Sequence, residues 1–246
     1  MADMELKKKN IPKQITPSPI VEAVVEARYD TDYPEEVIPG LLYNELKARF
    51  PKPVEKLPVA NLPAEVKNRD PNLQFAPHYR FPGENLSVQV GPKVFSLLNH
   101  PKYMGWEKYS EEIRFAFDVL KKSSIVKKPR RLGVRYINFF EFDIFDKLEA
   151  SLTLAGNSIA GNQSFLRTEF AIGDYRCVLQ IANGTTIQAG GASKKGSVVD
   201  IDLSRERPFS WDELRDLIND AHDLEKQLFF NLLKDDYLKT LSPIYP

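Results

Sequence analysis

Residues 131–142 read RLGVRYINFFEF and have the clearest strand pattern in this chain of 246 residues. Successive side chains of a strand point to opposite faces. One face would carry Leu132, Val134, Tyr136, Asn138, Phe140 and Phe142. The other would carry Arg135, Ile137, Phe139 and Glu141. Because apolar side chains occur on both faces, the stretch predicts a central strand of a sheet.

The rest of the first half alternates between strand and helix patterns. Residues 20–29 alternate in polarity, which predicts a half-buried strand. Apolar side chains spaced by three and four predict helices within residues 34–50 and 103–122. Between the helices, we expect strands at residues 79–81 and 86–98.

The second half is richer in strand patterns. We expect strands at residues 164–172, 175–181, 185–189 and 197–203. Gly173-Asp174 is typical of a hairpin loop, and Asn183-Gly184 is a stronger hairpin signal. The glycines of residues 190–196 indicate a flexible loop.

The last helix has a strong start signal. Ser210 and Glu213 have the spacing of a capping box, and Phe209 and Leu214 that of a hydrophobic staple. An apolar face then continues to Leu232, so we expect this helix to lie across the sheet.

These patterns predict an α+β fold, in which a curved antiparallel or mixed β-sheet packs on a long C-terminal helix. We expect two coupled α/β halves. Residues 1–150 form a β-α-β-β-α-β half with a proline-rich connection at residues 51–82, and residues 151–246 form a β-rich half that ends in the helix. Neither half has enough apolar helix surface to close alone, so we expect one cooperative domain.

Composition excludes several classes of protein. The 34 Lys and Arg balance the 34 Asp and Glu, which argues against a dedicated nucleic-acid coat protein. No apolar run reaches the ~18 residues of a membrane span, and no secretory signal is visible. The single cysteine, Cys177, excludes an internal disulfide and a multi-cysteine zinc site. We therefore expect a cytoplasmic protein with no membrane association and no cofactor.

One segment is strongly basic. It contains seven cations and no acid: Lys121, Lys122, Lys127, Lys128, Arg130, Arg131 and Arg135. The favoured interpretation is a solvated edge, since cations at a helix C-terminus are ordinary. The alternative interpretation is a phosphate-binding surface for nucleic acid or a nucleotide.

Acidic side chains also share strand faces. Asp200 and Asp202 lie on one face of a predicted strand, and similar acids occur on other strands. Together they are candidates for a Mg²⁺ site of a nuclease. Arginines such as Arg28, Arg135 and Arg167 occur in similar numbers, however, which favours cross-strand ion pairs.

Other catalytic combinations find little support in the sequence. Cys177 lies in an apolar strand, where a buried thiol is usually inert. His222 lies beside the apolar stripe of the last helix and is expected to pack there. The loop at residues 191–197 lacks the lysine of a phosphate-binding loop.

Several stretches, taken in order, resemble a known family. They are PIVEAVVEAR (19–28), YMGW (103–106), LGVRYIN (132–138), DID (200–202), and His222 with Phe229. The chain resembles a sporadically distributed prokaryotic protein family of similar length, which carries no assigned activity. The occurrence of that family is similar to that of phage-defence and mobile-element genes, and the resemblance implies a role of that kind.

Two functional hypotheses follow. In the first, the protein is a non-catalytic binding or assembly protein that works with a partner protein or as a homo-oligomer, as a component of a phage-defence or mobile-element system. Its candidate ligand-binding residues are Arg28, Arg135, Asn138, Lys127, Lys128, Arg130 and Arg131. In the second, the basic segment binds nucleic acid or a nucleotide, and Asp200 and Asp202 hold the metal of a nuclease.

Overall fold

The chain forms a mixed α+β fold with a large antiparallel sheet. The computed structural model describes residues 3–7, 10–71, 73–158, 163–189 and 192–246, and these contain five α-helices. The strand order of the sheet is β2-β3-β4-β5-β1-β6-β11-β10-β9. The α+β class is therefore as predicted, whereas the predicted curvature of the sheet stays a prediction.

The chain divides into two compact units that interleave along the sequence. Unit 1 comprises Met1–Val21, Arg135–Ser204 and Asp220–Pro246, and unit 2 comprises Glu22–Val134 and Arg205–Asn219. Strand β6 (Lys128–Phe140) and helix α4 (Leu214–Leu232) contribute residues to both units. That residues 1–150 and 151–246 fold as one cooperative domain stays a prediction.

Unit 2 contains most of the strands that the sequence predicted for the first half of the chain. Its strands are β1 (Ile20–Asp30), β2 (Glu55–Lys56), β3 (Tyr79–Pro82), β4 (Leu86–Gly91) and β5 (Val94–Asn99). The prediction of one strand over residues 86–98 is wrong, because the chain turns at Pro92 and Lys93 and returns as β5. Proline has no N–H to continue the ladder, which suits this position.

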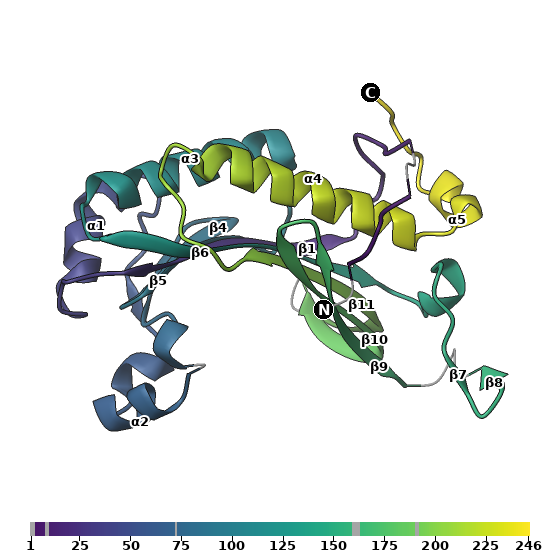
Figure 1. Ribbon diagram of the computed structural model, residues 1–246, viewed down its shortest axis with the longest axis horizontal. Helices are drawn as coiled ribbons and strands as arrows, with labels where there is room; N and C mark the ends of the chain where they lie inside the picture. Colours follow the sequence, from purple (N-terminus) through teal and green to yellow (C-terminus); the bar gives the residue numbers. More distant parts are fainter. Residues whose placement is uncertain (1–2, 8–9, 72, 159–162, 190–191) are drawn as a thin grey trace. The chain divides into compact units, whose positions relative to one another are not determined.

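The helices of unit 2 cover both faces of its sheet. Helices α1 (Ile38–Leu46) and α3 (Trp106–Lys122) lie on one face, and the short α2 (Ala64–Arg69) lies on the other (Figure 1). The proline-rich connection at residues 51–82 therefore contains short helices. Prolines suit the first positions of short helices, and Pro58 begins the 3₁₀ turn η1 (Pro58–Asn61) while Pro63 caps α2.

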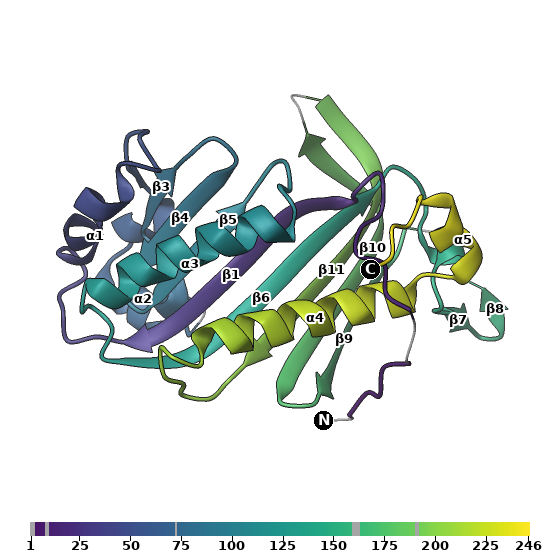
Figure 2. The same ribbon diagram turned by 90° about the horizontal axis from the view of Figure 1, so that it is seen from above.

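Unit 1 carries the second-half strands. They are β9 (Phe165–Ile172), β10 (Tyr175–Ala189) and β11 (Ala192–Arg205), next to the C-terminal part of β6. A separate small sheet contains β7 (Thr153–Leu154) and β8 (Asn157–Ser158). The C-terminal part of α4 crosses one face of β6, β11 and β10, and the short α5 (Asp235–Thr240) follows it (Figure 2).

The predicted hairpin at Asn183-Gly184 is wrong. Strand β10 continues through this dipeptide, with a shift of register between Ala182 and Thr185. Gly184 adopts a φ of 71°, and its N–H donates to Asn183 Oδ1 at 2.8 Å, which is the geometry of a bulge. The predicted loop at residues 190–196 is also corrected, because 192–196 belong to β11, while 190 and 191 lie outside the described residues.

The capping box before α4 is confirmed. Ser210 N–H donates to Glu213 Oε2 at 2.7 Å, and Glu213 N–H donates to Ser210 Oγ at 3.4 Å. Helix α4 is long, at 19 residues, but α5 rather than α4 is the last helix. In the described part of the chain, no helix is long and apolar enough to cross a membrane.

Candidate functional site

The basic segment, interpreted from the sequence as a solvated edge or, alternatively, as a phosphate-binding surface, lies against acidic side chains of unit 2. Lys127 Nζ is 3.0 Å from Asp32 Oδ2, and Arg130 Nε donates to Asp30 Oδ2 at 2.6 Å. Lys128 is exposed, and no acid of the described chain pairs with it. The neighbouring acids therefore neutralise part of the positive charge that the sequence places here.

Arg28 and Arg131 meet at one carboxylate. Arg28 Nε and Arg131 Nη1 lie 2.8 Å and 2.9 Å from Glu26 Oε1. Arg131 Nε also donates to Glu206 Oε1 at 2.9 Å, and the Arg28 guanidinium lies 4.6 Å from the centre of the Phe75 ring. The structure thus brings these two predicted residues together, as partners of acids and an aromatic ring.

In unit 1, Arg135 binds Asp200 in a bidentate pair. Nε and Nη2 of Arg135 donate to Oδ1 and Oδ2 of Asp200 at 2.8 Å and 2.6 Å, and Gln180 Nε2 donates to Oδ2 at 2.9 Å. The Asp200 side chain is only 7% exposed. A metal ion at Asp200 and Asp202 would have to displace these donors, and no cluster of three or more metal-binding side chains occurs among the described residues.

Asn138 does not join this site. It lies on the opposite face of β6 from Arg135, because the two residues are three positions apart on a strand. Asn138 is 1% exposed, and its Nδ2 donates to the Val199 carbonyl oxygen at 3.2 Å. It therefore serves the interior of unit 1, and its role as a ligand-binding residue stays a prediction.

The interior of unit 1 also holds titratable side chains. Tyr136 Oη lies 2.9 Å from His222 Nδ1, and burial lowers the pKa of His222 to about 3. Burial raises the pKa of Cys177 to about 12 and that of Glu225 to about 8. At pH 7 the Cys177 thiol and the Glu225 carboxyl group are therefore mainly protonated, and the His222 imidazole is a neutral, weak base.

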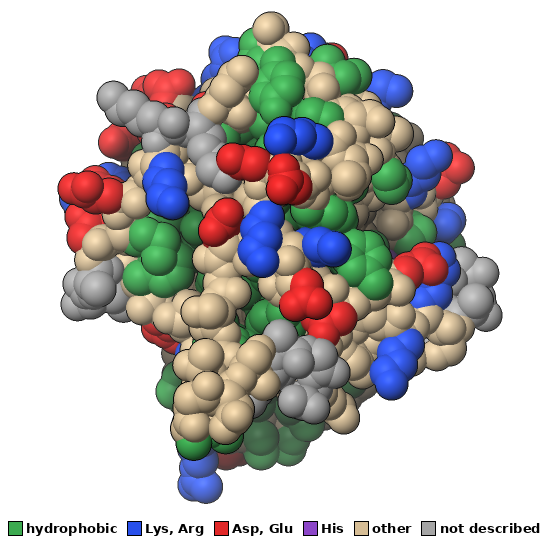
Figure 3. Space-filling model, turned by 90° about the vertical axis from the view of Figure 1, so that its right-hand side faces the viewer, with side chains coloured by type: hydrophobic (Ala, Val, Ile, Leu, Met, Phe, Trp, Pro, Cys, Tyr) green, Lys and Arg blue, Asp and Glu red, His purple; other side chains and the backbone are tan. Residues whose placement is uncertain are grey.

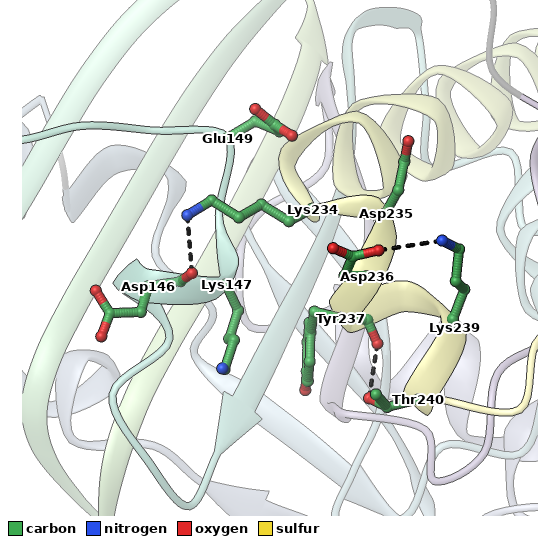
Figure 4. Close-up of a pocket in the computed structure, with 9 residues that line it drawn as sticks. All are labelled: Asp146, Lys147, Glu149, Lys234, Asp235, Asp236, Tyr237, Lys239 and Thr240. Atoms are coloured by element: carbon green, nitrogen blue, oxygen red, sulfur yellow. Dashed lines mark hydrogen bonds and ion pairs between the residues drawn. The ribbon is translucent and has the colours of Figure 1, made fainter.

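A hollow of about 570 Å³ beside α5 was not visible in the sequence. Its lining joins two segments that are distant in the chain: Asp146, Lys147, Glu149, and residues Lys234, Asp235, Asp236, Tyr237, Lys239 and Thr240 (Figure 4). Asp236 pairs with Lys239 at 3.1 Å, and Lys234 Nζ donates to the Asp146 carbonyl oxygen at 2.9 Å. Acids and cations are interspersed on this end of unit 1, so the hollow presents no single sign of charge (Figure 3).

The outer edge of β9 has no neighbouring strand in the sheet. On its inner side, β9 pairs with β10 from Tyr175↔Ile172 to Ala182↔Phe165. On its outer side, Met4 N–H donates to the Ala171 carbonyl oxygen at 2.9 Å. Backbone groups of alternate residues point to the same side of a strand, so those of Phe165, Arg167 and Glu169 also point outward. No other backbone group of the described chain bonds to them.

The side chains of β9 place charge next to this edge. Glu169 pairs with Arg167 and with Arg176, each at 2.5 Å. Hydrogen bonds from Arg176 and Arg167 lower the pKa of Glu169, so this carboxylate is ionised at pH 7. Phe165 at the start of the strand is 65% exposed. Sequence patterns predicted the strand, but its place at the edge depends on which strands pair.

Comparison with known proteins gives no further assignment. No protein-family model matches the sequence, and no curated protein matches it.

Proposed function

We propose that the chain is a non-catalytic binding or assembly protein, which adds a β-strand of a partner protein to the outer edge of β9. The observation that carries the proposal is the row of outward backbone groups at Phe165, Arg167 and Glu169. In strand addition, main-chain hydrogen bonds supply affinity and alternate side chains supply specificity.

Two further observations support binding rather than chemistry. Burial keeps the Cys177 thiol protonated at pH 7 and makes the His222 imidazole a weak base. The Asp200 carboxylate, which was a candidate metal ligand, is bound by Arg135 and Gln180. The family resemblance adds the proposal that the assembly belongs to a phage-defence or mobile-element system. The single cysteine favours a reducing cytoplasm as its location.

Replacing Arg167 by proline tests this function. Arg167→Pro removes an outward N–H and no bond to β10, and edge strands tolerate such a proline. Lys56→Pro is the matched control, because the backbone N–H of Lys56 points away from β3. The N–H of the next residue, Leu57, points the other way and donates to the His78 carbonyl oxygen.

The readout is amide hydrogen exchange of the wild type and both variants, each in complexes purified from the cells that make the protein. We expect the Glu169 amide to exchange at least tenfold more slowly in wild type and in Lys56→Pro than in Arg167→Pro. Equal exchange of the Glu169 amide in all three proteins would contradict strand addition at β9.

The alternative function is nucleic-acid or nucleotide binding through the basic segment, with metal-dependent nuclease activity. The observation that favours it is that Lys122 and Lys128 are exposed and pair with no acid of the described chain. Binding of duplex DNA should then weaken by orders of magnitude between 50 and 200 mM salt. Unchanged cleavage by Asp200→Asn would remove the nuclease form of this alternative.

A further inference from the structure

We propose that the strand which pairs with β9 is the β9 strand of a second copy of this chain, antiparallel to it about a two-fold axis at Thr168. The inference rests on the strand-addition function proposed above and names the partner. Three features of the described residues lead to it: the direction of the backbone groups, the charges of the edge and the apolar side chains of its other face.

The backbone groups allow this register. A two-fold axis at Thr168 places Arg167 opposite Glu169 of the second copy, and Glu169 opposite Arg167 of the second copy. All four residues direct their N–H and C=O groups outward, so each pair exchanges two N–H···O=C bonds. Thr168 lies on the axis as a pair without hydrogen bonds, because its backbone groups already bond to β10.

The charges select this register over its neighbours. With the axis at Thr168, each directly opposite pair joins an arginine and a glutamate. Moving the axis to Arg167 would place two arginines opposite each other, and moving it to Glu169 would place two glutamates opposite each other. Opposite charges in directly opposed positions stabilise a sheet, and like charges destabilise it.

The core-side face of β9 is complementary in the same register. Leu166, which is half-buried, falls opposite Phe170 of the second copy, which is buried. The N-terminal segment limits how far the two β9 strands can pair, because the Met4 N–H already donates to the Ala171 carbonyl oxygen. Because the interface is the same patch on both copies, the assembly closes as a dimer. In this dimer the outward backbone groups of Arg167 and Glu169 are all hydrogen-bonded.

Charge reversal in separate chains tests the register. Arg167→Glu alone places glutamate opposite glutamate, and Glu169→Arg alone places arginine opposite arginine. An equimolar mixture restores both opposite-charge pairs in a heterodimer. By sedimentation equilibrium, we expect a wild-type dimer, at least tenfold weaker self-association of each variant, and recovery of the dimer in the mixture. Circular dichroism establishes that each variant is folded.

A cysteine at the axis gives an independent test that does not reverse any charge. Thr168→Cys places two thiols opposite each other in a pair without hydrogen bonds, where the side chains approach most closely. We expect a disulfide-linked dimer under mild oxidation with copper phenanthroline, and much less from Glu169→Cys. Cys177 is buried and does not compete.

The outcomes separate this inference from the function on which it rests. A monomeric wild type, or a mixture of charge variants that does not associate, overturns the second-copy partner. If the Glu169 amide is nevertheless protected in a complex with another protein, strand addition stands and only the second copy is wrong. If the amide is unprotected in every sample, both proposals fail.

Discussion

The two edge strands of the sheet, β2 and β9, differ in length and in their content of lysine and nearby proline. Strand β2 has two residues, carries Lys56, and lies between Pro53 and Pro58. Strand β9 has eight residues, FLRTEFAI, without proline or lysine. Short length, lysine and proline are the means by which proteins prevent edge-to-edge association. The contrast supports the proposal that β9, and not β2, accepts a strand.

The largest expected effect concerns the sheet that carries β9. A Cβ atom at Gly196 of β11 would overlap the carbonyl oxygen of Phe140 on β6, so Gly196→Ala must move backbone. We expect a loss of about 3 kcal/mol of folding free energy, at the upper end of overpacking effects, and loss of association through β9. Urea unfolding measures the stability, and sedimentation measures the association.

Gly40→Ala is the matched control for that substitution. Gly40 lies in α1 of unit 2, and a Cβ there meets nothing within 4 Å. The change should be neutral or stabilise the protein by about 0.5–1 kcal/mol, since alanine is the better helix former. Equal effects of the two substitutions would show that the β9 sheet does not depend on the Gly196 contact.

The buried ionisable groups of the two units also differ. In unit 2, buried Lys67 pairs with Glu35 at 2.7 Å. In unit 1, Glu225 is 5% exposed and forms no hydrogen bond with another described residue, and burial raises its pKa from 4.5 to about 8. The pKa of Glu225 is higher in the folded state than in the unfolded state. Its contribution to folding stability is therefore fully present below pH 4.5 and is lost as the pH rises towards 8.

Glu225→Gln should remove this pH dependence. The free energy of unfolding of the wild type should fall by on the order of a few kcal/mol between pH 5 and pH 8, because each unit of pKa shift corresponds to about 1.4 kcal/mol. The variant should keep its stability over that range. Asp223→Asn, which changes an exposed acid of the same helix, should behave like wild type. Urea unfolding at both pH values measures this, and equal losses in the variant and wild type would count against it.

Ion pairs offer a smaller test of the same contrast. Arg135 satisfies the nearly buried Asp200, so Arg135→Ala should cost about 2 kcal/mol by leaving a carboxylate with fewer donors. Arg130 pairs with Asp30 at an exposed position of unit 2, and Arg130→Ala should cost at most about 0.5–1 kcal/mol. Thermal unfolding compares them, and a larger loss in Arg130→Ala would reverse the expected order.

Giving β9 the protection that β2 has should weaken association without a loss of folding stability. Leu166→Lys puts a charge on the half-buried face that would meet Phe170 of the second copy. We expect about tenfold weaker association, which corresponds to about 1.4 kcal/mol, and a folded protein. Lys56→Leu should leave the association unchanged, because Pro53, Pro58 and the short strand still limit pairing. Sedimentation equilibrium measures both variants.

Local signals predicted much of the fold. The capping box at Ser210 and the central strand β6 depend on neighbouring residues, and both occur in the structure. Asn183-Gly184 misled the prediction because the same dipeptide suits a hairpin and a bulge, and only the continued pairing of β10 with β11 distinguishes them. Partner strands distant in sequence decide such choices.

The candidate site was harder to predict for the same reason. The sequence predicted β9 as a strand, but an edge is defined by the strand that does not follow it in the sheet order. The arginines and acids of the strands could be paired in several ways, and the bidentate contact of Arg135 with Asp200 required the register of β6 and β11. The hollow beside α5 joins Asp146 to Asp236 across many residues, and no local pattern marks it.

The most direct test of the account is amide hydrogen exchange at the two edges as a function of protein concentration. The account predicts that the Arg167 and Glu169 amides of β9 exchange more slowly as the concentration rises, while the Lys56 amide of β2 keeps a constant, fast rate. Concentration-independent exchange of all three amides would contradict it.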